Sequence, residues 1–426
     1  MKNKSFIRSF IGTAGIQLFA KGITLLTGVL FARALGPEDF GRYGFVISII
    51  SLAVLPAIAG LPQLIIREIS RYRIDNSFPL LNGMLKWSTK YVISISLLSI
   101  FVTAFFTYLG FWSDASGGLI LSALILIPLK GFLSKQGAVI NGFQRPELAQ
   151  LPAQVLVPAL SLCVVSVLHF FSDDRLTSQT LIYIQIFTHI NAVFLSLILL
   201  GFVLKKDSQP ANPEYQTNRW HKALFPFTIL AVVGTMNNEL ATVMLGFLGS
   251  EESVGYFKVA MTGTTVLALG LQSVNAVSAP RIASMYKQNN LVGTQEILSK
   301  SVKLGAISSI PFAILLIFFG EYLVTFFFGE DYMPAAYLLS ILCIGQIFNI
   351  CIGSVGIVLN MTGNEKFTLR AQVITLTLTI GLLNILIPLY QAIGAAISVS
   401  VGLVFWNVIM AFYVYRLTGL KTWLRF

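Results

Sequence analysis

Charged side chains within long apolar segments are the residues of this sequence whose types could do chemistry. Lys21 lies near the middle of one such segment, Lys130 follows Pro128 in another, and Glu239 lies well inside a third. A charge at the centre of a bilayer costs about 2.5–3.5 kcal/mol, so each of these residues marks a candidate functional site. A lysine there can bind an anion, and a desolvated carboxylate can exchange a proton near neutral pH. We therefore expect ligand-binding cations at Lys21 and Lys130 and an ion-coupling group at Glu239. A structural ion pair is the alternative for each.

Four further polar residues extend this candidate site. Asn237 and Asn238 precede Glu239, where their amides could bind hydroxyl groups or satisfy polar contacts between helices. Arg33 and Lys258 lie near the ends of apolar segments, so a ligand contact and snorkelling to the membrane surface are both open.

Three arginines are candidates for a different task. Arg67, Arg145 and Arg281 lie in polar turns between apolar segments. Basic side chains at such positions can close a cytoplasmic gate or contact anionic lipid headgroups.

The composition says which elements must position these residues. Of 426 residues, 55% are hydrophobic and 11% are charged, whereas an ordinary soluble domain carries roughly 25% charged residues. Disorder is excluded because it requires low hydrophobicity. A membrane-spanning helix takes ~20 apolar residues, and the sequence offers about twelve such segments. We place them near residues 10–33, 42–66, 85–112, 117–141, 150–171, 181–204, 222–247, 254–280, 304–328, 333–361, 367–389 and 391–416.

The basic residues behind the net charge of +11 indicate the membrane topology. Most of the 29 basic residues, Lys135 among them, fall on the side of the N-terminus when the segments are threaded in turn. Positive charge favours the cytoplasmic side, so we expect both termini in the cytoplasm. Nucleic-acid binding is disfavoured because the basic residues are scattered in short runs.

An internal repeat organises the segments. Residues 35–39 (LGPED) recur as 248–252 (LGSEE), and residues 153–155 (AQV) recur as 371–373, in each case roughly 215 positions later. Asn141 and Asn360 match between these pairs. We expect an N-terminal six-helix bundle at 1–204, a cytoplasmic linker at 205–221 and a C-terminal six-helix bundle at 222–426. An even number of helices in each bundle makes them parallel repeats, as in transporters that rock around a central site.

Three motifs carry a resemblance to a known family. Residues 32–44 (ARALGPEDFGRYG) resemble the loop after the first helix of bacterial polysaccharide flippases. These are the O-antigen and teichoic-acid exporters of the MATE-like multidrug/oligosaccharidyl-lipid/polysaccharide superfamily. Residues 141–145 (NGFQR) and 328–332 (FGEDY) resemble two further loops of that family. The chain departs from the family in the second copy of the first motif, where Ser250 replaces Pro37 and the glycine shifts to Gly255. Twelve segments also argue against the fourteen-helix lipid II branch.

The resemblance implies a MATE-like fold and a function. The protein would move an undecaprenyl-diphosphate-linked oligosaccharide from the inner to the outer leaflet of the bacterial inner membrane. Alternating access driven by a proton or sodium gradient is implied, with no cofactor. Its partners would be membrane lipids, the lipid-linked oligosaccharide and other polysaccharide assembly proteins.

Two rival functions remain. A MATE-like drug or metabolite antiporter would need acidic groups for cationic cargo, which are scarce in the apolar segments. A membrane polysaccharide polymerase would need a sizeable outer loop with catalytic residues. The outer loops are short, and no nucleophile–base set or metal-ligand spacing is present in the sequence, so we expect no enzyme.

Overall fold

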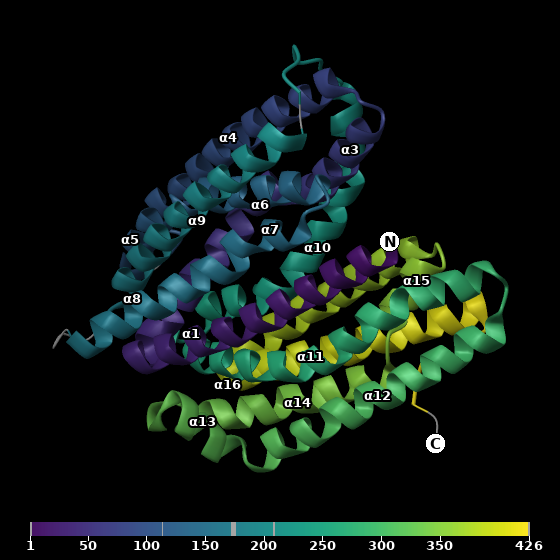
Figure 1. Ribbon diagram of the computed structural model, residues 1–426. Helices are drawn as coiled ribbons and strands as arrows, with labels where there is room; N and C mark the ends of the chain where they lie inside the picture. The colour runs from purple at the N-terminus through teal and green to yellow at the C-terminus, as the bar shows by residue number, and fades with distance from the viewer. Residues whose placement is uncertain (1, 113, 172–175, 208, 425–426) are drawn as a thin grey trace. The chain divides into compact units, whose positions relative to one another are not determined.

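The computed structural model describes residues 2–112, 114–171, 176–207 and 209–424, which form helices joined by short turns (Figure 1). The elements are α1 (Lys2–Ala53), α2 (Leu55–Ile58), α3 (Leu61–Ile74), α4 (Phe78–Tyr108), α5 (Asp114–Ala123), α6 (Leu126–Gly142), α7 (Pro146–Gln150), the π-helix η1 (Leu151–Leu156), α8 (Val157–Phe171), α9 (Ser178–Asp207), α10 (Thr217–Leu248), α11 (Glu251–Lys287), α12 (Leu291–Phe318), α13 (Gly320–Phe328), the 3₁₀ turn η2 (Glu330–Tyr332), α14 (Pro334–Ile352), α15 (Val355–Met361) and α16 (Glu365–Thr418). The prediction of an all-α chain is confirmed for these residues.

Ten helices within the described ranges are long and apolar enough to cross a membrane, fewer than the roughly twelve predicted segments. The difference lies in the two longest helices. Non-helical backbone at Gly36 (φ 77°) divides α1, and non-helical backbone at Gln391 (φ 51°) divides α16. Helix α1 therefore contains a predicted loop, and α16 joins the last two predicted segments.

The two arms of α16 run antiparallel beside each other. A Cβ at Gly394 would overlap the carbonyl of Leu386, and a Cβ at Gly402 would overlap the hydroxyl of Thr379. The reversal needs a left-handed residue, which is costly for a side chain other than glycine. Gln391 occupies it, and its Oε1 accepts a hydrogen bond from the backbone N–H of Ser250 at 3.1 Å.

The chain folds into two compact units. Unit 1 comprises Met1–Leu35 and Phe45–Thr235, and unit 2 comprises Gly36–Gly44 and Met236–Phe426. Helix α10 contributes its first part to unit 1 and its second part to unit 2. The predicted linker at 205–221 lies in unit 1, while the predicted assignment of the two bundles stays a prediction.

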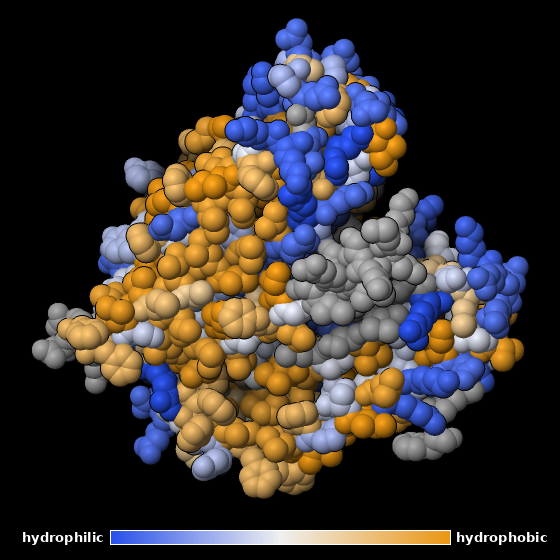
Figure 2. All heavy atoms as spheres, viewed as in Figure 1, coloured by the Kyte–Doolittle hydropathy of each residue, from blue (hydrophilic) through white to orange (hydrophobic). Residues whose placement is uncertain are grey.

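Exposed apolar side chains cover much of unit 1. On α4 and α9, Phe101, Phe105, Phe194 and Phe202 each expose more than half of their surface. Figure 2 shows the apolar surface, and it shows hydrophilic residues gathered at the end where α3 meets α4. This distribution is the one expected of helices that face lipid along their length and water at their ends.

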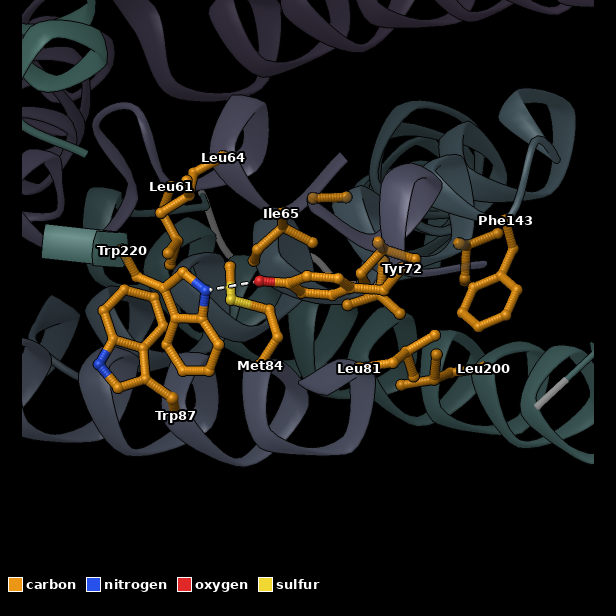
Figure 3. Packing of buried hydrophobic residues seen from close by; sticks show 14 of the residues in the cluster. Leu61, Leu64, Ile65, Tyr72, Leu81, Met84, Trp87, Phe143, Leu200 and Trp220 are labelled. Carbon is orange, nitrogen blue, oxygen red and sulfur yellow. Dashed lines mark hydrogen bonds between the residues drawn. The ribbon is translucent and has the colours of Figure 1, made fainter. Parts of the chain in front are cut away.

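Trp220 holds the end of the predicted linker in the core of unit 1. It is fully buried against Trp87 and Tyr72, and its Nε1 donates a hydrogen bond to the Tyr72 hydroxyl at 2.9 Å (Figure 3). Earlier in the same segment, the backbone N–H of Glu214 donates to the carbonyl of Pro79 at 2.9 Å. Although the segment is polar in composition and was predicted as a linker, its Trp220 is fully buried in the core of unit 1.

Replacing Trp220 with alanine is expected to destabilise unit 1 by about 3–5 kcal/mol, because a large buried ring leaves a cavity and Tyr72 loses its donor. A lower melting temperature in detergent measures the loss. Trp423→Ala is the control, since Trp423 is 37% exposed and should shift the temperature little. Equal shifts for the two variants would contradict the packing role.

Candidate functional site

Glu239 and Lys258 form an ion pair inside unit 2. The Glu239 carboxylate on α10 lies 3.6 Å from the Lys258 ammonium on α11, and each side chain is about a quarter exposed. Sequence reasoning assigned Glu239 to ion coupling and Lys258 to substrate binding, and the structure brings the two together. Protonation of the carboxylate would remove the attraction between them, so a proton could change how α10 and α11 are held.

The Lys258 stem rests on the segment Gly36–Gly44. A Cβ placed on Gly44 would come within 3.1 Å of the Lys258 Cγ, which is closer than ordinary packing. A larger residue at position 44 would therefore displace the lysine and alter its distance from Glu239. The segment that follows the break in α1 thus helps to position the ion pair.

The segment Gly36–Gly44 also crosses the first turns of α11 without intervening side chains. A Cβ on Gly41 would overlap the backbone of Glu251, and a Cβ on Gly255 would overlap the backbone of Pro37. We call this crossing the helix-start contact. The two segments are counterparts in the internal repeat, so the shifted glycine of the second copy allows a mutual close approach.

An ion pair fastens the helix-start contact. Arg42 donates to the Glu251 carboxylate through Nε at 2.9 Å and Nη2 at 2.6 Å, and it also lies near Glu38 and Asp39. The opposing start of α11 is capped by Ser250, whose hydroxyl accepts a hydrogen bond from the Ser253 N–H at 3.2 Å. Acidic residues from both copies of the repeated motif therefore surround one arginine.

Tyr332 completes the helix-start contact. This buried ring lies edge-on to Phe40 from the first motif and to Tyr256 from its repeat counterpart. Phe328 packs on it from the other side. Two of the three family-like motifs and the repeat of one of them thus converge at one place in unit 2.

Reversing the charges of Arg42 and Glu251 one at a time should destabilise the helix-start contact, and reversing both should restore part of the loss, since Glu38 and Asp39 still repel a glutamate at position 42. A coupling energy of about 0.5–3 kcal/mol is expected from residues in direct contact. Melting temperatures of Arg42→Glu, Glu251→Arg and the double variant measure it. The matched control is the exposed pair Lys300–Glu296, whose swap should show coupling near 0–1 kcal/mol. If the melting-temperature changes of the two single variants simply add in the double variant, the ion pair does not stabilise the helix-start contact.

The remaining predicted ligand residues divide between the units. Lys21 and Arg33 are exposed on α1 in unit 1, and Lys130 is half-buried at the first turn of α6. Asn237 is half-buried and Asn238 exposed on α10 in unit 2. The structure brings Asn237 and Asn238 near Glu239 along one helix; the roles of all five residues stay predictions.

Two of the three predicted gate arginines, Arg67 and Arg145, have defined neighbours in unit 1. Arg67 donates to the Glu68 carboxylate at 2.8 and 3.0 Å and lies over the Phe227 ring. Arg145 donates to Asp207 at 2.8 Å. Arg281 is exposed near the C-terminal end of α11 in unit 2. Their gate or headgroup role stays a prediction.

Sequence reasoning misplaced one cation. Lys135 was counted with the loop charges, but it is buried within α6, where its ammonium donates to the Thr89 hydroxyl at 2.7 Å. Its position six residues before the end of an apolar segment was the available signal. Among the described residues, no group of three or more His, Cys, Asp or Glu side chains is placed to hold a metal ion.

Comparison with known proteins identifies two family matches. Residues 6–286 match the family described as polysaccharide biosynthesis protein, and residues 226–386 match the MatE family. The first match covers more than half of the chain.

Similar proteins extend over nearly the whole length. The chain is 22% identical over 387 residues to a capsular polysaccharide biosynthesis protein of Staphylococcus aureus, covering 89% of this chain and 91% of that protein. It is 22% identical over 428 residues to a protein of Haloferax volcanii named as a probable low-salt glycan biosynthesis flippase, covering 98% and 84%.

Solved structures share the fold. The lipid II flippase MurJ in an inward closed conformation superposes with a TM-score of 0.76 at 16% identity, over 94% of this chain and 87% of that chain. An inward-facing MATE transporter of the MOP superfamily gives 0.75 at 12% identity, over 95% and 96%. At these identities the likeness concerns the fold, and it confirms the prediction of a MATE-like multi-pass membrane protein.

Proposed function

Because the chain belongs to the polysaccharide biosynthesis protein family of the MOP superfamily, we propose that it is a flippase that moves a lipid-linked oligosaccharide across the membrane. The observation that carries the proposal is the match to this family over residues 6–286. The family is one of transporters, and the relatives are named for capsular polysaccharide biosynthesis and, as a probable flippase, for low-salt glycan biosynthesis.

The candidate residues suit an anionic, sugar-bearing cargo. Lys21, Lys130 and Arg33 in unit 1 supply cations for the diphosphate of an undecaprenyl-linked substrate, and Asn237 and Asn238 supply amides for its hydroxyl groups. Such a substrate cannot cross hydrocarbon unaided, because its charges and hydroxyl groups would lose their hydration.

Topology gives the transport a direction. We place both termini in the cytoplasm and count twelve crossings, with α1 divided at Gly36 and α16 at Gln391. The antiparallel arms of α16 support this count. On this topology the helix-start contact lies on the outer side of the membrane. Arg67, Arg145 and Arg281 then lie toward the cytoplasmic side, where we expect them to act as gate residues or to contact lipid headgroups.

A drug antiporter is the second candidate, because the MatE family matches residues 226–386. Such a protein would need a carboxylate for a cationic drug. Glu239 is paired with Lys258, and the buried Glu68 is paired with Arg67, so both carboxylates already face cations. This pairing favours the flippase.

Reconstitution distinguishes the two functions. Proteoliposomes would carry undecaprenyl-diphosphate-linked oligosaccharide, and an external glycosidase would digest only molecules in the outer leaflet. We expect the fraction of lipid-linked oligosaccharide that the glycosidase digests to rise above one half with time when an ion gradient of either direction is imposed. Ethidium flux into these proteoliposomes should equal that into protein-free vesicles. If the protein transports ethidium and does not translocate the glycan, its function is that of a drug antiporter and not of a flippase.

A further inference from the structure

A cavity of about 350 Å³ lies inside unit 2, apart from the Glu239–Lys258 pair. It is partly open to the surface and is lined by the C-terminal half of α11, the end of α14, α15 and both arms of α16. Small-molecule sites in proteins span ~300–1,000 Å³, so the cavity is large enough for a small ligand. No residue assigned to the transport site contributes to it.

The polar lining consists of uncharged groups. Five carboxamides and two hydroxyls face the cavity, and none of the described residues that line it carries a charge. The carboxamides are Asn275, Asn349, Asn360, Gln372 and Asn407, and the hydroxyls are Ser354 and Thr368. Carboxamides supply donors and acceptors together, which matches a ligand whose own groups do both.

Hydrogen bonds within the lining fix several of these groups in place. The Thr368 hydroxyl donates to Asn360 Oδ1 at 3.0 Å, and the Asn349 amide donates to Gln346 Oε1 at 3.1 Å. The Ser354 hydroxyl is bonded to Asn275 Oδ1. A lining held in this way is pre-organised, so a ligand would find its partners already oriented.

Two buried polar atoms of residues that line the cavity have no hydrogen-bond partner within the described part of the chain. They are Oε1 of Gln372, on the first arm of α16, and Nε1 of Trp406, on the second arm. One is an acceptor and the other a donor, and burying either without a partner is unfavourable. Both atoms are covered by protein, so a ligand reaches them only when the Gln372 and Trp406 side chains turn toward the cavity. A ligand that offers both a donor and an acceptor would then satisfy them together.

We propose that this cavity binds one or two neutral sugar residues of the cargo. A sugar ring carries hydroxyls that both donate and accept, and its C–H face suits the Trp406 indole. The uncharged lining disfavours a diphosphate or an organic cation, each of which needs an opposite charge. The proposal rests on the proposed function and adds a sugar-recognition site that is separate from the cationic residues.

The place of the cavity fits cargo loading. The short turn 362–364 follows α15, and the proposed topology puts that turn on the cytoplasmic side. The sugar would therefore be read before translocation, on the side where lipid-linked oligosaccharides are assembled. The cavity would then decide which glycan is accepted.

Binding of free sugars tests the cavity without transport. Saturation-transfer NMR would titrate the purified protein with glucose, galactose, rhamnose and N-acetylglucosamine, none of which carries a lipid or a phosphate. We expect at least one sugar to bind with a dissociation constant of about 1–10 mM, as few hydrogen bonds allow. Gln372→Ala and Trp406→Phe should each weaken binding about tenfold, since each loses one hydrogen bond from a buried group.

The internal repeat supplies the matched control. Gln154 is the first-half counterpart of Gln372 and is exposed on η1, so Gln154→Ala should leave sugar binding unchanged. Trp406→Phe keeps a ring in place, and an unchanged melting temperature would show that it folds. Absence of binding for all four sugars, or binding that survives both cavity variants, would overturn the proposal.

The flux assay separates this proposal from the proposed function. If wild-type protein translocates the lipid-linked oligosaccharide but binds no free sugar, the flippase stands and the sugar site falls. If sugar binding follows the cavity residues but no glycan is translocated, the cavity stands and the flippase falls.

Discussion

Glu239→Gln is expected to abolish the dependence of glycan translocation on a proton gradient while leaving slow, downhill exchange between leaflets. One pH unit corresponds to about 1.4 kcal/mol for each coupled proton, which is about a tenfold change in the distribution ratio. Wild-type protein should reach a ratio of that order between the leaflets, and the glutamine variant should stay near unity. Glutamine keeps the size of the side chain but cannot exchange a proton.

The Lys258 pair makes the test sharper, because Glu239 has a partner only 3.6 Å away. If the carboxylate served only as the partner of that lysine, the neutral double variant Glu239→Gln/Lys258→Met would recover the gradient response. If it carries the coupling ion, the double variant stays uncoupled and Lys258→Met alone remains responsive. Repeating the assay with a sodium gradient identifies the ion.

Glu296→Gln is the matched control for this experiment. Glu296 also pairs with a lysine, Lys300 at 2.6 Å, but both side chains are mostly exposed on α12. Its replacement should leave coupling intact. A gradient response of Glu239→Gln equal to that of wild type would remove Glu239 from the coupling mechanism.

The helical architecture and the ends of many helices follow from local properties of the sequence. Apolar length predicts spanning helices, and the recurrence of LGPED as LGSEE at 248–252 predicts two related loops. The pairing of those loops with each other is different, because close packing at Gly41 and Gly255 depends on two segments more than 200 residues apart. The glycines were visible, but their partners were not.

The Glu239–Lys258 ion pair was likewise predictable only in part, because its residues could be picked out from the sequence but their contact could not. Glu239 and Lys258 were both singled out because charges in apolar segments are costly. Nothing in the spacing said that they meet, since they lie on different helices whose packing decides the distance. Sequence analysis left a structural ion pair open for Glu239 without a partner, and the structure places Lys258 beside the carboxylate.

Polar groups that carry no charge were the hardest to interpret. Gln372 was quoted only as part of a repeat, and Asn275 and Trp406 attracted no attention. A single amide in an apolar helix is compatible with ordinary packing, so no local pattern marks a site. Only the fold gathers five amides from α11, α14, α15 and α16 around one cavity.

Lys21→Ala is expected to lower the rate of glycan translocation at least about thirtyfold, because losing a charge that contacts an anionic ligand costs about 2–5 kcal/mol. Lys21 is exposed on α1, within the candidate span Gly15–Ala53. The same flux assay and the amount of surface polysaccharide in a strain that lacks its flippase measure the loss. Lys21→Arg keeps the charge and should retain much of the activity.

The melting temperature separates a ligand role from a structural role at this position. A lysine that acts by contacting the cargo is not required for folding, so alanine should lower translocation and leave the melting temperature nearly unchanged. A lysine that served only as the partner of a carboxylate would give the reverse, with lower stability on replacement. Lys90→Ala, at an exposed site on α4 outside the candidate ligand residues, controls for loss of positive charge. Full translocation by Lys21→Ala would remove this residue from the mechanism and leave diphosphate binding to Lys130 and Arg33, which the same comparison can test in turn.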